Sequence, residues 1–457
     1  MQGVAKDEFD WGLYPELEKF ITGKVNKFLS KHKFASALSK KMLDRTSTRF
    51  VDWIDHIVLP YSEAKGDLLE KLGLQVVETE GDPDDAVVYR HPASYLFPVL
   101  LTSKNRTEVA LKPEELDHFL QVIGAGTGSE GEPYSRFRKA VLKKDGAYTL
   151  SAVERRGYNG FAVEPSDDIE EYLRVSSRFF HRQRYFDDDG EGMAHFEKLM
   201  RSQLSELESG RVADAFFRSE RVYWQSRNRA GQVQKARQDT LGLGWGNHDH
   251  HTYRSSRENF TRMIRIFESM GYGCRERYYA GERAGWGAQI LEHPVCEIVA
   301  FTDVDLNPDE TRIDFAHQGF KETEKKLGTV GLWIGLHGES ILQAGMHHLE
   351  ARFDHDRLTA DLPKYGIEVM PPFSRFDFLK QAFTVGERWE VDKSRLDKLL
   401  KQKYINRNQY EEFLRNGAIG SHMENLERDQ GFKGFNKASV TKIILETDPR
   451  AQHLGGA

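Results

Sequence analysis

The sequence is poor in cysteine and contains no long apolar run. Its 457 residues include only Cys274 and Cys296, which excludes a disulfide framework and a zinc site built from cysteines. No stretch approaches the roughly 18 apolar residues that predict a membrane-spanning helix. We therefore expect no membrane partner, and any metal ion is expected to rely on histidine, aspartate or glutamate.

The sequence also lacks an excess of one charge and any short repeat. Its 65 Lys and Arg and 71 Asp and Glu residues are interspersed and give a net charge of −6, so we expect no nucleic-acid partner. Repeats of about 20–50 residues are absent, which excludes a solenoid. The segment from Met1 to Glu8 lacks the basic and apolar parts of a secretory signal, so the expected location is cytoplasmic.

The sequence does contain enough apolar residues, 39% of the total, for two or three domains. The spacing of these residues divides the chain into regions and predicts the α+β class. The regions are a helical lead-in (1–50), a first βαβββ module (51–164), a helical insertion (165–240), a second βαβββ module (241–330) and a mixed α/β C-terminal region (331–457). Residues 396–414 within the last region are predicted to form a helical hairpin.

A short sequence motif, Asp-His within a predicted strand, is found in each predicted βαβββ module. Asp55-His56 lies in a predicted strand at 53–59, and Asp249-His250 lies in a predicted strand at 247–254. In both modules an amphipathic segment, a glycine and a His-Pro pair follow. Because a small module cannot surround an ion alone, two equivalent histidines suggest one metal ion bound between the two copies. His56 and His250 are therefore predicted metal ligands.

A carboxylate ligand would complete a face of two histidines and one carboxylate, and would leave positions open for substrate and dioxygen. Asp314, in a predicted strand at 311–317, and Glu297, in a predicted strand at 296–302, are alternatives for this role. His248 is a rival of His250, because alternation along a strand places both on one face.

Other interpretations of these histidines stay open at this stage. His56 and His250 are also explained as polar ends of strands whose neighbouring aspartates cap turns. The pair His347-His348, in the C-terminal region, is expected to be solvated or to belong to a core.

Four segments together resemble the family of 2-oxoadipate dioxygenase/decarboxylase (hydroxyglutarate synthase), within the vicinal oxygen chelate superfamily. They are Asp55–Leu59, Tyr89–Pro92, Asn247–Arg254 and Ile313–Ala316, and the resemblance covers roughly residues 50–115 and 241–320. It implies a β-sheet cleft of the vicinal-oxygen-chelate type that holds non-haem Fe(II) by a histidine from each module and a glutamate on a late strand. By resemblance His56 and His250 are ligands, and Asp314 stands where the family has its glutamate.

The sequence departs from the family pattern at two positions. Pro60 replaces an arginine that, in the family, binds the substrate carboxylate four residues after the first histidine. The Asp314 side chain is one methylene shorter than the family glutamate, so Glu297 remains an alternative for the third ligand.

The sequence that follows His250 matches the family pattern more closely than the sequence that follows His56. Arg254 follows His250 by four residues in the His-x-Thr-x-Arg motif and is the predicted substrate-carboxylate ligand; its alternative role is a surface salt bridge. Tyr253 is the other candidate catalytic residue, and alternation along the strand places it on the opposite face.

The preferred hypothesis is a non-haem Fe(II)-dependent oxygenase of the dioxygenase/decarboxylase type. Its expected substrates are O2 and a 2-oxo acid or a similar carboxylate-bearing small molecule that chelates the metal. Zn(II), Mn(II) and Ni(II) are alternatives to Fe(II). The alternative functions are a glyoxalase-like metal-dependent isomerase or lyase, which needs no oxygen, and a non-catalytic protein that binds a small ligand.

Overall fold

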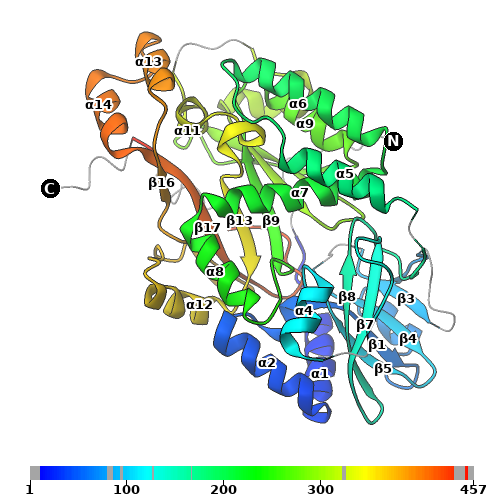
Figure 1. The fold of residues 1–457 in the computed structure, drawn as a ribbon. Helices are drawn as coiled ribbons and strands as arrows, with labels where there is room; N and C mark the ends of the chain where they lie inside the picture. The colour runs from blue at the N-terminus through cyan, green and yellow to red at the C-terminus, as the bar shows by residue number, and fades with distance from the viewer. Residues whose placement is uncertain are drawn as a thin grey trace.

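Two mixed β-sheets with flanking helices make up the fold (Figure 1). The computed structural model describes residues 11–79, 86–92, 96–125, 128–165, 167–321, 326–436 and 448–450. In Figure 1 the first sheet is drawn in blue and cyan at the lower right, and the second sheet runs from green to red through the centre. The α+β class predicted from the sequence is confirmed.

The first sheet contains two βαβββ units, where the sequence predicted one. Its eight strands follow the order β2-β3-β4-β1-β5-β8-β7-β6, and β1 pairs antiparallel with β5 at the centre. The first unit comprises β1 (Ile54–Pro60), α3 (Gly66–Lys71), β2 (Gln75–Val76), β3 (Val87–Arg90) and β4 (Val99–Ser103). The second comprises β5 (Thr107–Leu111), α4 (Leu116–Ile123), β6 (Ser129–Glu130), β7 (Phe137–Asp145) and β8 (Tyr148–Arg155).

The second sheet repeats this arrangement. Its main order is β10-β11-β12-β9-β13-β17-β15-β14, with β16 paired to β17, and β9 pairs antiparallel with β13 at the centre. The first unit comprises β9 (His248–Arg254), α9 (Phe260–Ser269), β10 (Gly273–Tyr279), β11 (Trp286–Glu292) and β12 (Val299–Asp305). The second comprises β13 (His348–Arg352), α12 (His355–Asp361), β14 (Ser374–Phe376), β15 (Leu379–Phe383), β16 (Glu387–Trp389) and β17 (Ala418–Arg428).

Residues 348–428 therefore supply the second half of this sheet. The predicted helical hairpin is confirmed, as α13 (Lys393–Lys401) and α14 (Arg407–Asn416) lie between β16 and β17 in the chain. Asn406 caps α14 by accepting a hydrogen bond from the amide of Gln409, which ends the turn between the two helices. Paired βαβββ units are the arrangement that the resemblance to the vicinal oxygen chelate superfamily implies.

Helices cover both sheets through separate apolar cores. The N-terminal helices α1 (Pro15–Lys31) and α2 (Lys33–Thr46) pack with the first sheet, because Leu17, Phe28 and Leu38 share a core with β1 and β5. The second sheet shares its largest core with the four helices between the sheets in sequence. These helices are α5 (Ile169–Phe180), α6 (Asp189–Leu204), α7 (Ser209–Ser226) and α8 (Arg229–Asp239). In the described ranges, no helix has both the length and the apolar character needed to cross a bilayer.

Short helices form the remaining connections of the second sheet. They are η2 (Pro308–Arg312), α10 (Phe315–Gln318), α11 (Thr329–His337), η3 (Ser340–Ala344) and η4 (Leu362–Tyr365), while η1 (Phe50–Trp53) precedes β1.

Two of these short helices replace the strand predicted at 311–317. Asn307 and Glu310 form a reciprocal capping box at the start of η2, and Pro308 begins the turn with its φ angle already restricted. Asp314 consequently stands at the N-cap of α10 instead of within a strand.

A glycine contact joins the first sheet to the helical layer. Gly157, just after β8, has a φ of +69°, and a Cβ atom there would lie 2.3 Å from the backbone oxygen of Gly210 in α7. Gly146 has a similar φ of +60°, but a Cβ atom there would meet nothing within 4 Å.

We predict that Gly157→Ala destabilises the fold by about 2–4 kcal/mol, because backbone strain is added to a steric clash. Gly146→Ala carries the same backbone strain without the clash and should cost about 1 kcal/mol. Urea unfolding of both variants measures the difference. Equal losses of stability in the two variants would show that the close approach of Gly157 to α7 does not contribute to the stability of the fold.

Candidate metal centre

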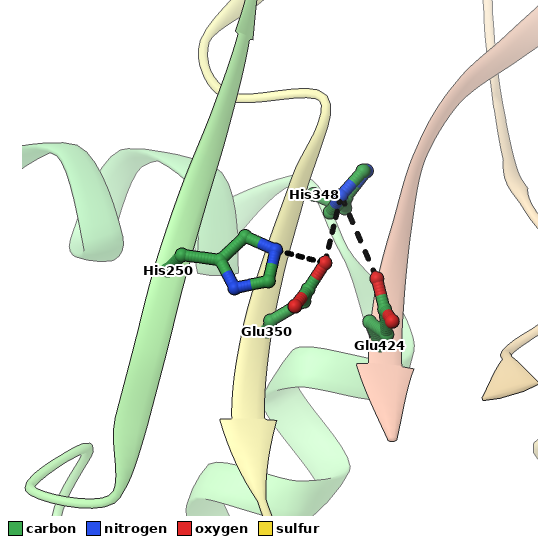
Figure 2. A group of neighbouring side chains, drawn as sticks. All are labelled: His250, His348, Glu350 and Glu424. Atoms are coloured by element: carbon green, nitrogen blue, oxygen red, sulfur yellow. Dashed lines mark ion pairs between the residues drawn. The ribbon is translucent and has the colours of Figure 1, made fainter. Parts of the chain in front are cut away.

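Four buried side chains from three neighbouring strands of the second sheet converge on one point (Figure 2). They are His250 on β9, His348 and Glu350 on β13, and Glu424 on β17. One potential ligand atom of each lies within 4.8 Å of the others, and none of the four is more than 9% exposed. This is a cluster of two imidazoles and two carboxylates.

The strand register creates the cluster. His348 and Glu350 are two residues apart on β13 and therefore share one face of the sheet. The parallel pairing of β13 with β17 places Glu350 beside Glu424, while the antiparallel pairing of β9 with β13 places His348 beside Thr252. His250 shares the face of Thr252, so its ring lies next to Glu350.

Glu350 lies between the two histidines. Its Oε1 atom contacts Nε2 of His250 and lies 3.5 Å from Nε2 of His348 (Figure 2). Oε2 of Glu424 lies 3.7 Å from the same His348 nitrogen. Gln381, on β15, donates a hydrogen bond of 2.8 Å to the other oxygen of Glu424 and so fixes this carboxylate.

Asp249 orients the first histidine of the cluster. Its Oδ1 lies 2.9 Å from Nδ1 of His250, which places the proton on Nδ1 and leaves the lone pair of Nε2 directed at the cluster. Although burial opposes ionisation, Arg428 and His250 keep the pKa of Asp249 below its ordinary value. The aspartate is therefore charged, as an orienting partner of a metal-bound histidine should be.

The electrostatics of the cluster suit a divalent cation. Burial raises the pKa of Glu424 to about 7, and burial together with Glu424 raises the pKa of Glu350 well above its ordinary value. Burial also lowers the pKa of His250 to about 4, so its imidazole is neutral. Without a cation the site favours the protonated carboxylates more than water does, whereas a bound divalent ion favours their ionised forms. Neutral imidazoles and carboxylates are donors for Fe(II), Mn(II) and Zn(II).

The cluster forms part of the wall of a cavity. Thr252, Arg254, His347 and His422 also line it, and the rest of the wall is largely aromatic. The aromatic residues are Tyr278, Trp286, Phe301, Phe373, Phe383 and Phe435.

Arg254 is the cationic group of this cavity. Its guanidinium lies over the ring of Trp333, 5.4 Å from the ring centre, and its Nε atom is 3.7 Å from Asp303 and makes no hydrogen bond. Burial raises the pKa of Asp303 to about 7 in spite of Arg254, so the carboxylate is a weak partner. The geometry leaves Arg254 able to bind an anionic group inside the cavity.

A second cavity shares His250 and Phe301 with the first. Buried Nε atoms of Arg275, Arg352 and Arg428 make no hydrogen bonds there. Basic residues outnumber acidic ones among its lining residues, which include Lys112, Arg275, Arg352, Arg428 and Lys433 against Asp249, Glu292 and Glu297. The surroundings of His250 thus favour a negatively charged ligand.

His56 lies on β1 of the first sheet and His250 on β9 of the second, and the group of potential ligands around His250 does not include His56. Nδ1 of His56 lies 2.7 Å from Asp55, and its ring meets the edge of Phe161 at 5.2 Å between ring centres. Among the residues that the structure describes, His56 belongs to no group of three or more potential metal ligands. The candidate cluster lies within the second sheet, and the cavity lined by Asp55 of β1 and His248 of β9 includes neither His56 nor His250 among its lining residues.

The register explains why the first sheet has no matching cluster. β1 pairs with β5 as β9 pairs with β13, and β5 pairs with β8 as β13 pairs with β17. The residues of the first sheet that correspond to His348, Glu350 and Glu424 are Glu108, Ala110 and Ser151. Both carboxylates opposite the histidine are therefore missing, although the Asp-His pair remains.

The two predicted carboxylate ligands also lie outside the cluster. Asp314 is half-exposed and lies 2.7 Å from Nδ1 of His317. Glu297 precedes β12 in a left-handed backbone conformation and receives a hydrogen bond of 2.5 Å from Arg90 of the first sheet. Neither residue lies on the strand predicted for it, and the carboxylates beside His250 come from β13 and β17.

The remaining candidates lie on different sides of β9. His248 lines the second cavity, and its Nδ1 atom has no hydrogen-bond partner. Tyr253 is fully buried in the core behind the sheet, where its ring packs 5.3 Å from that of Phe267. Arg254, two residues beyond Thr252 on the face of His250, is the one of the predicted catalytic pair that lines the metal-site cavity.

Sequence reasoning missed three of the four clustered residues. His348 was expected to be solvated or part of a core, and no role was expected for Glu350 or Glu424. One signal was present: His-x-Glu occurs at 348–350 and again at 422–424, and on strands this spacing places both side chains on one face.

The sequence matches no protein-family model and no curated protein. Similar solved structures include a Shewanella frigidimarina protein, with 14% identity, a TM-score of 0.32 and coverage of 47% of this chain and 92% of that one. Methylmalonyl-CoA epimerase of Mycobacterium tuberculosis has 12% identity, a TM-score of 0.23 and coverage of 40% and 88%. The uncharacterized protein YdcJ of Shigella flexneri, which includes domain DUF1338, has 14% identity, a TM-score of 0.24 and coverage of 62% and 84%. Likenesses at this level assign no activity to this chain.

We predict that Glu424→Gln binds one equivalent of metal fewer than the wild type, because the amide keeps the side-chain shape but cannot supply an anionic ligand. His56→Gln, the matched change in the first sheet, should bind as much metal as the wild type. Elemental analysis after equilibration with Fe(II) under argon measures both. Retention of all metal by Glu424→Gln, with loss in His56→Gln, would contradict this assignment.

Proposed function

We propose that the chain is a non-haem Fe(II)-dependent oxygenase of the dioxygenase/decarboxylase type. Its substrate would be a 2-oxo acid or a similar carboxylate-bearing molecule that chelates the metal. The observation that carries this proposal is the presence of the His250, His348, Glu350 and Glu424 cluster and of Arg254 in the wall of one cavity. A cation and an organic acid can be held there together.

His250, His348 and Glu424 would hold the metal as two imidazoles and one carboxylate, with Glu350 as a fourth available ligand. A divalent metal bound there would supply Lewis acidity and open positions for the vicinal oxygens of the substrate and for O2. This ligand set differs from that expected from the sequence, since His348 takes the place of His56 and a glutamate takes the place of Asp314.

The surrounding side chains position and enclose the substrate. Arg254 would bind its carboxylate through two parallel hydrogen bonds, a geometry that fits the planar guanidinium. Phe301, Phe383 and the other aromatic rings exclude water from the cavity, which strengthens this charge interaction. Asp249 and Gln381 hold His250 and Glu424 in fixed orientations.

The resemblance to the 2-oxoadipate dioxygenase/decarboxylase family supports the same assignment. The matching motif His250-x-Thr252-x-Arg254 lies on β9, and its three named residues line one cavity. Pro60 interrupts the corresponding pattern in the first sheet, where the carboxylates are also missing.

A glyoxalase-like isomerase or lyase is the second candidate, and the pair Glu350 and Glu424 favours it. One carboxylate could bind the metal while the other accepts a proton from the substrate, a role that a raised pKa suits. This reaction would use Zn(II) or Ni(II) and would consume no oxygen.

Oxygen uptake and carbon dioxide release, measured with a panel of 2-oxo acids and Fe(II)-loaded protein, test the first candidate. Substrate-dependent uptake of O2 with release of CO2 is the expected result. Conversion of a 2-oxo compound under argon with the Zn(II) or Ni(II) form would support the isomerase instead. Binding of the acids without turnover under all of these conditions would contradict both candidates and support a non-catalytic ligand-binding protein.

We predict that Arg254→Lys lowers kcat/KM about 100-fold, equivalent to about 2.7 kcal/mol, because lysine keeps the charge but loses the paired hydrogen bonds. The metal content should stay at the wild-type value, since Arg254 is not a ligand. Arg407→Lys, a change on the exposed face of α14, is the control and should leave kcat/KM unchanged. Equal activity of Arg254→Lys and wild type would remove Arg254 from the substrate site.

A further inference from the structure

We propose a second metal site, for a borderline-soft cation such as Zn(II), at the edge of the second sheet. Its ligands would be Glu268 at the end of α9, Cys274 on β10 and His317 on α10. The proposal is independent of the proposed function, because none of these residues lines the cavity that holds the first cluster.

The three side chains already face one another. One potential ligand atom of each lies within 4.8 Å of the other two. Nε2 of His317 is 3.0 Å from Oε1 of Glu268, and Sγ of Cys274 is 3.9 Å from the same oxygen. A metal ion bound between these atoms would replace their mutual hydrogen bonds.

Asp314 would orient the histidine of this site. Its Oδ2 atom lies 2.7 Å from Nδ1 of His317, so the imidazole is held through one nitrogen and presents the other to Glu268. A carboxylate behind a metal-binding histidine is the usual arrangement in such sites. Asp314 was predicted from the sequence to be a ligand of the first metal; here it would act on a different ion, through His317.

The ligand types indicate the metal. A thiolate, an imidazole and a carboxylate together favour Zn(II) over Mg(II) or Ca(II), which prefer oxygen ligands alone. The side chains of His317 and Glu268 are 41% and 35% exposed, which leaves a fourth position accessible to water. The sequence excluded a zinc site made of cysteines; this one needs a single cysteine among other ligands.

Proton release should accompany binding. Burial and Glu268 raise the pKa of Cys274 to about 12, and hydrogen bonds to Glu268 and Asp314 raise the pKa of His317 despite partial burial. The metal-free site therefore favours the protonated forms of Cys274 and His317. Binding of one Zn(II) would displace one proton from each.

The two cysteines of the chain allow a matched test. Co(II) bound to a thiolate gives a near-ultraviolet charge-transfer band, so titration of the full chain with Co(II) reports whether a cysteine is a ligand. We expect the band in the wild type and in Cys296→Ser, whose thiol instead donates to the backbone oxygen of Gly210. Cys274→Ser should lose the band and one equivalent of Co(II) and Zn(II).

Two further variants separate this site from the first and from a folding defect. His317→Gln, at a half-exposed position, should also lose one equivalent, with an unchanged circular dichroism spectrum. Asp314→Asn should keep the stoichiometry but weaken Zn(II) binding about 10–100-fold. Glu424→Gln should keep the charge-transfer band, because it affects only the first site. Absence of the band in the wild type, or its survival in Cys274→Ser, would overturn the proposal.

Discussion

The antiparallel pairing of β9 with β13 is the constraint on which the candidate centre depends. It joins two βαβββ units into one sheet and places the residues of one unit opposite those of the other. The register that pairs His348 with Thr252 and Leu349 with His251 continues to Glu350 opposite His250, and the parallel pairing of β13 with β17 adds Glu424. A shift of one residue would turn all the ligands of a strand to the opposite face. The centre therefore exists only when both halves of the sheet are in register.

The first sheet shows what the same architecture does without the carboxylates. Asp55 still bonds His56, but it is also held by Arg155 of β8 at 2.7 and 3.0 Å. The guanidinium carbon of Arg155 lies 4.9 Å from the ring centre of Phe161, whose ring lies 5.2 Å from that of His56. An internal ion pair thus satisfies the aspartate, and an aromatic ring packs against His56. The paired units permit a metal centre, and the side chains opposite the histidine decide whether one forms.

The sequence allowed the α+β class and one residue of the candidate cluster, His250, to be predicted, but not the pairing of the units. Both Asp-His strands and the helical hairpin at 396–414 were recognisable because local periodicity and capping determine them. The partners of His250 lie about 100 and 170 residues further along the chain, and only the pairing of β9, β13 and β17 brings them close. The strand predicted around Asp314 was wrong, because the neighbouring apolar residues have the spacing of a strand. Pro308 and the capping box start helical turns there instead.

Helix α7, in the helical region at 165–240, packs against the face of β9 that is opposite the cavity. His250 and Arg254 face the cavity, so His251 and Tyr253 point the other way, into the core formed with α7. There the Phe217 ring lies 4.9 Å from that of His251 and 6.1 Å from that of Tyr253. A strand covered only on its front would tolerate small shifts, and a metal centre loses affinity when its ligands move by a fraction of an ångström. The described part of the insertion therefore supports the strand that carries His250, without contributing a residue to the candidate cluster.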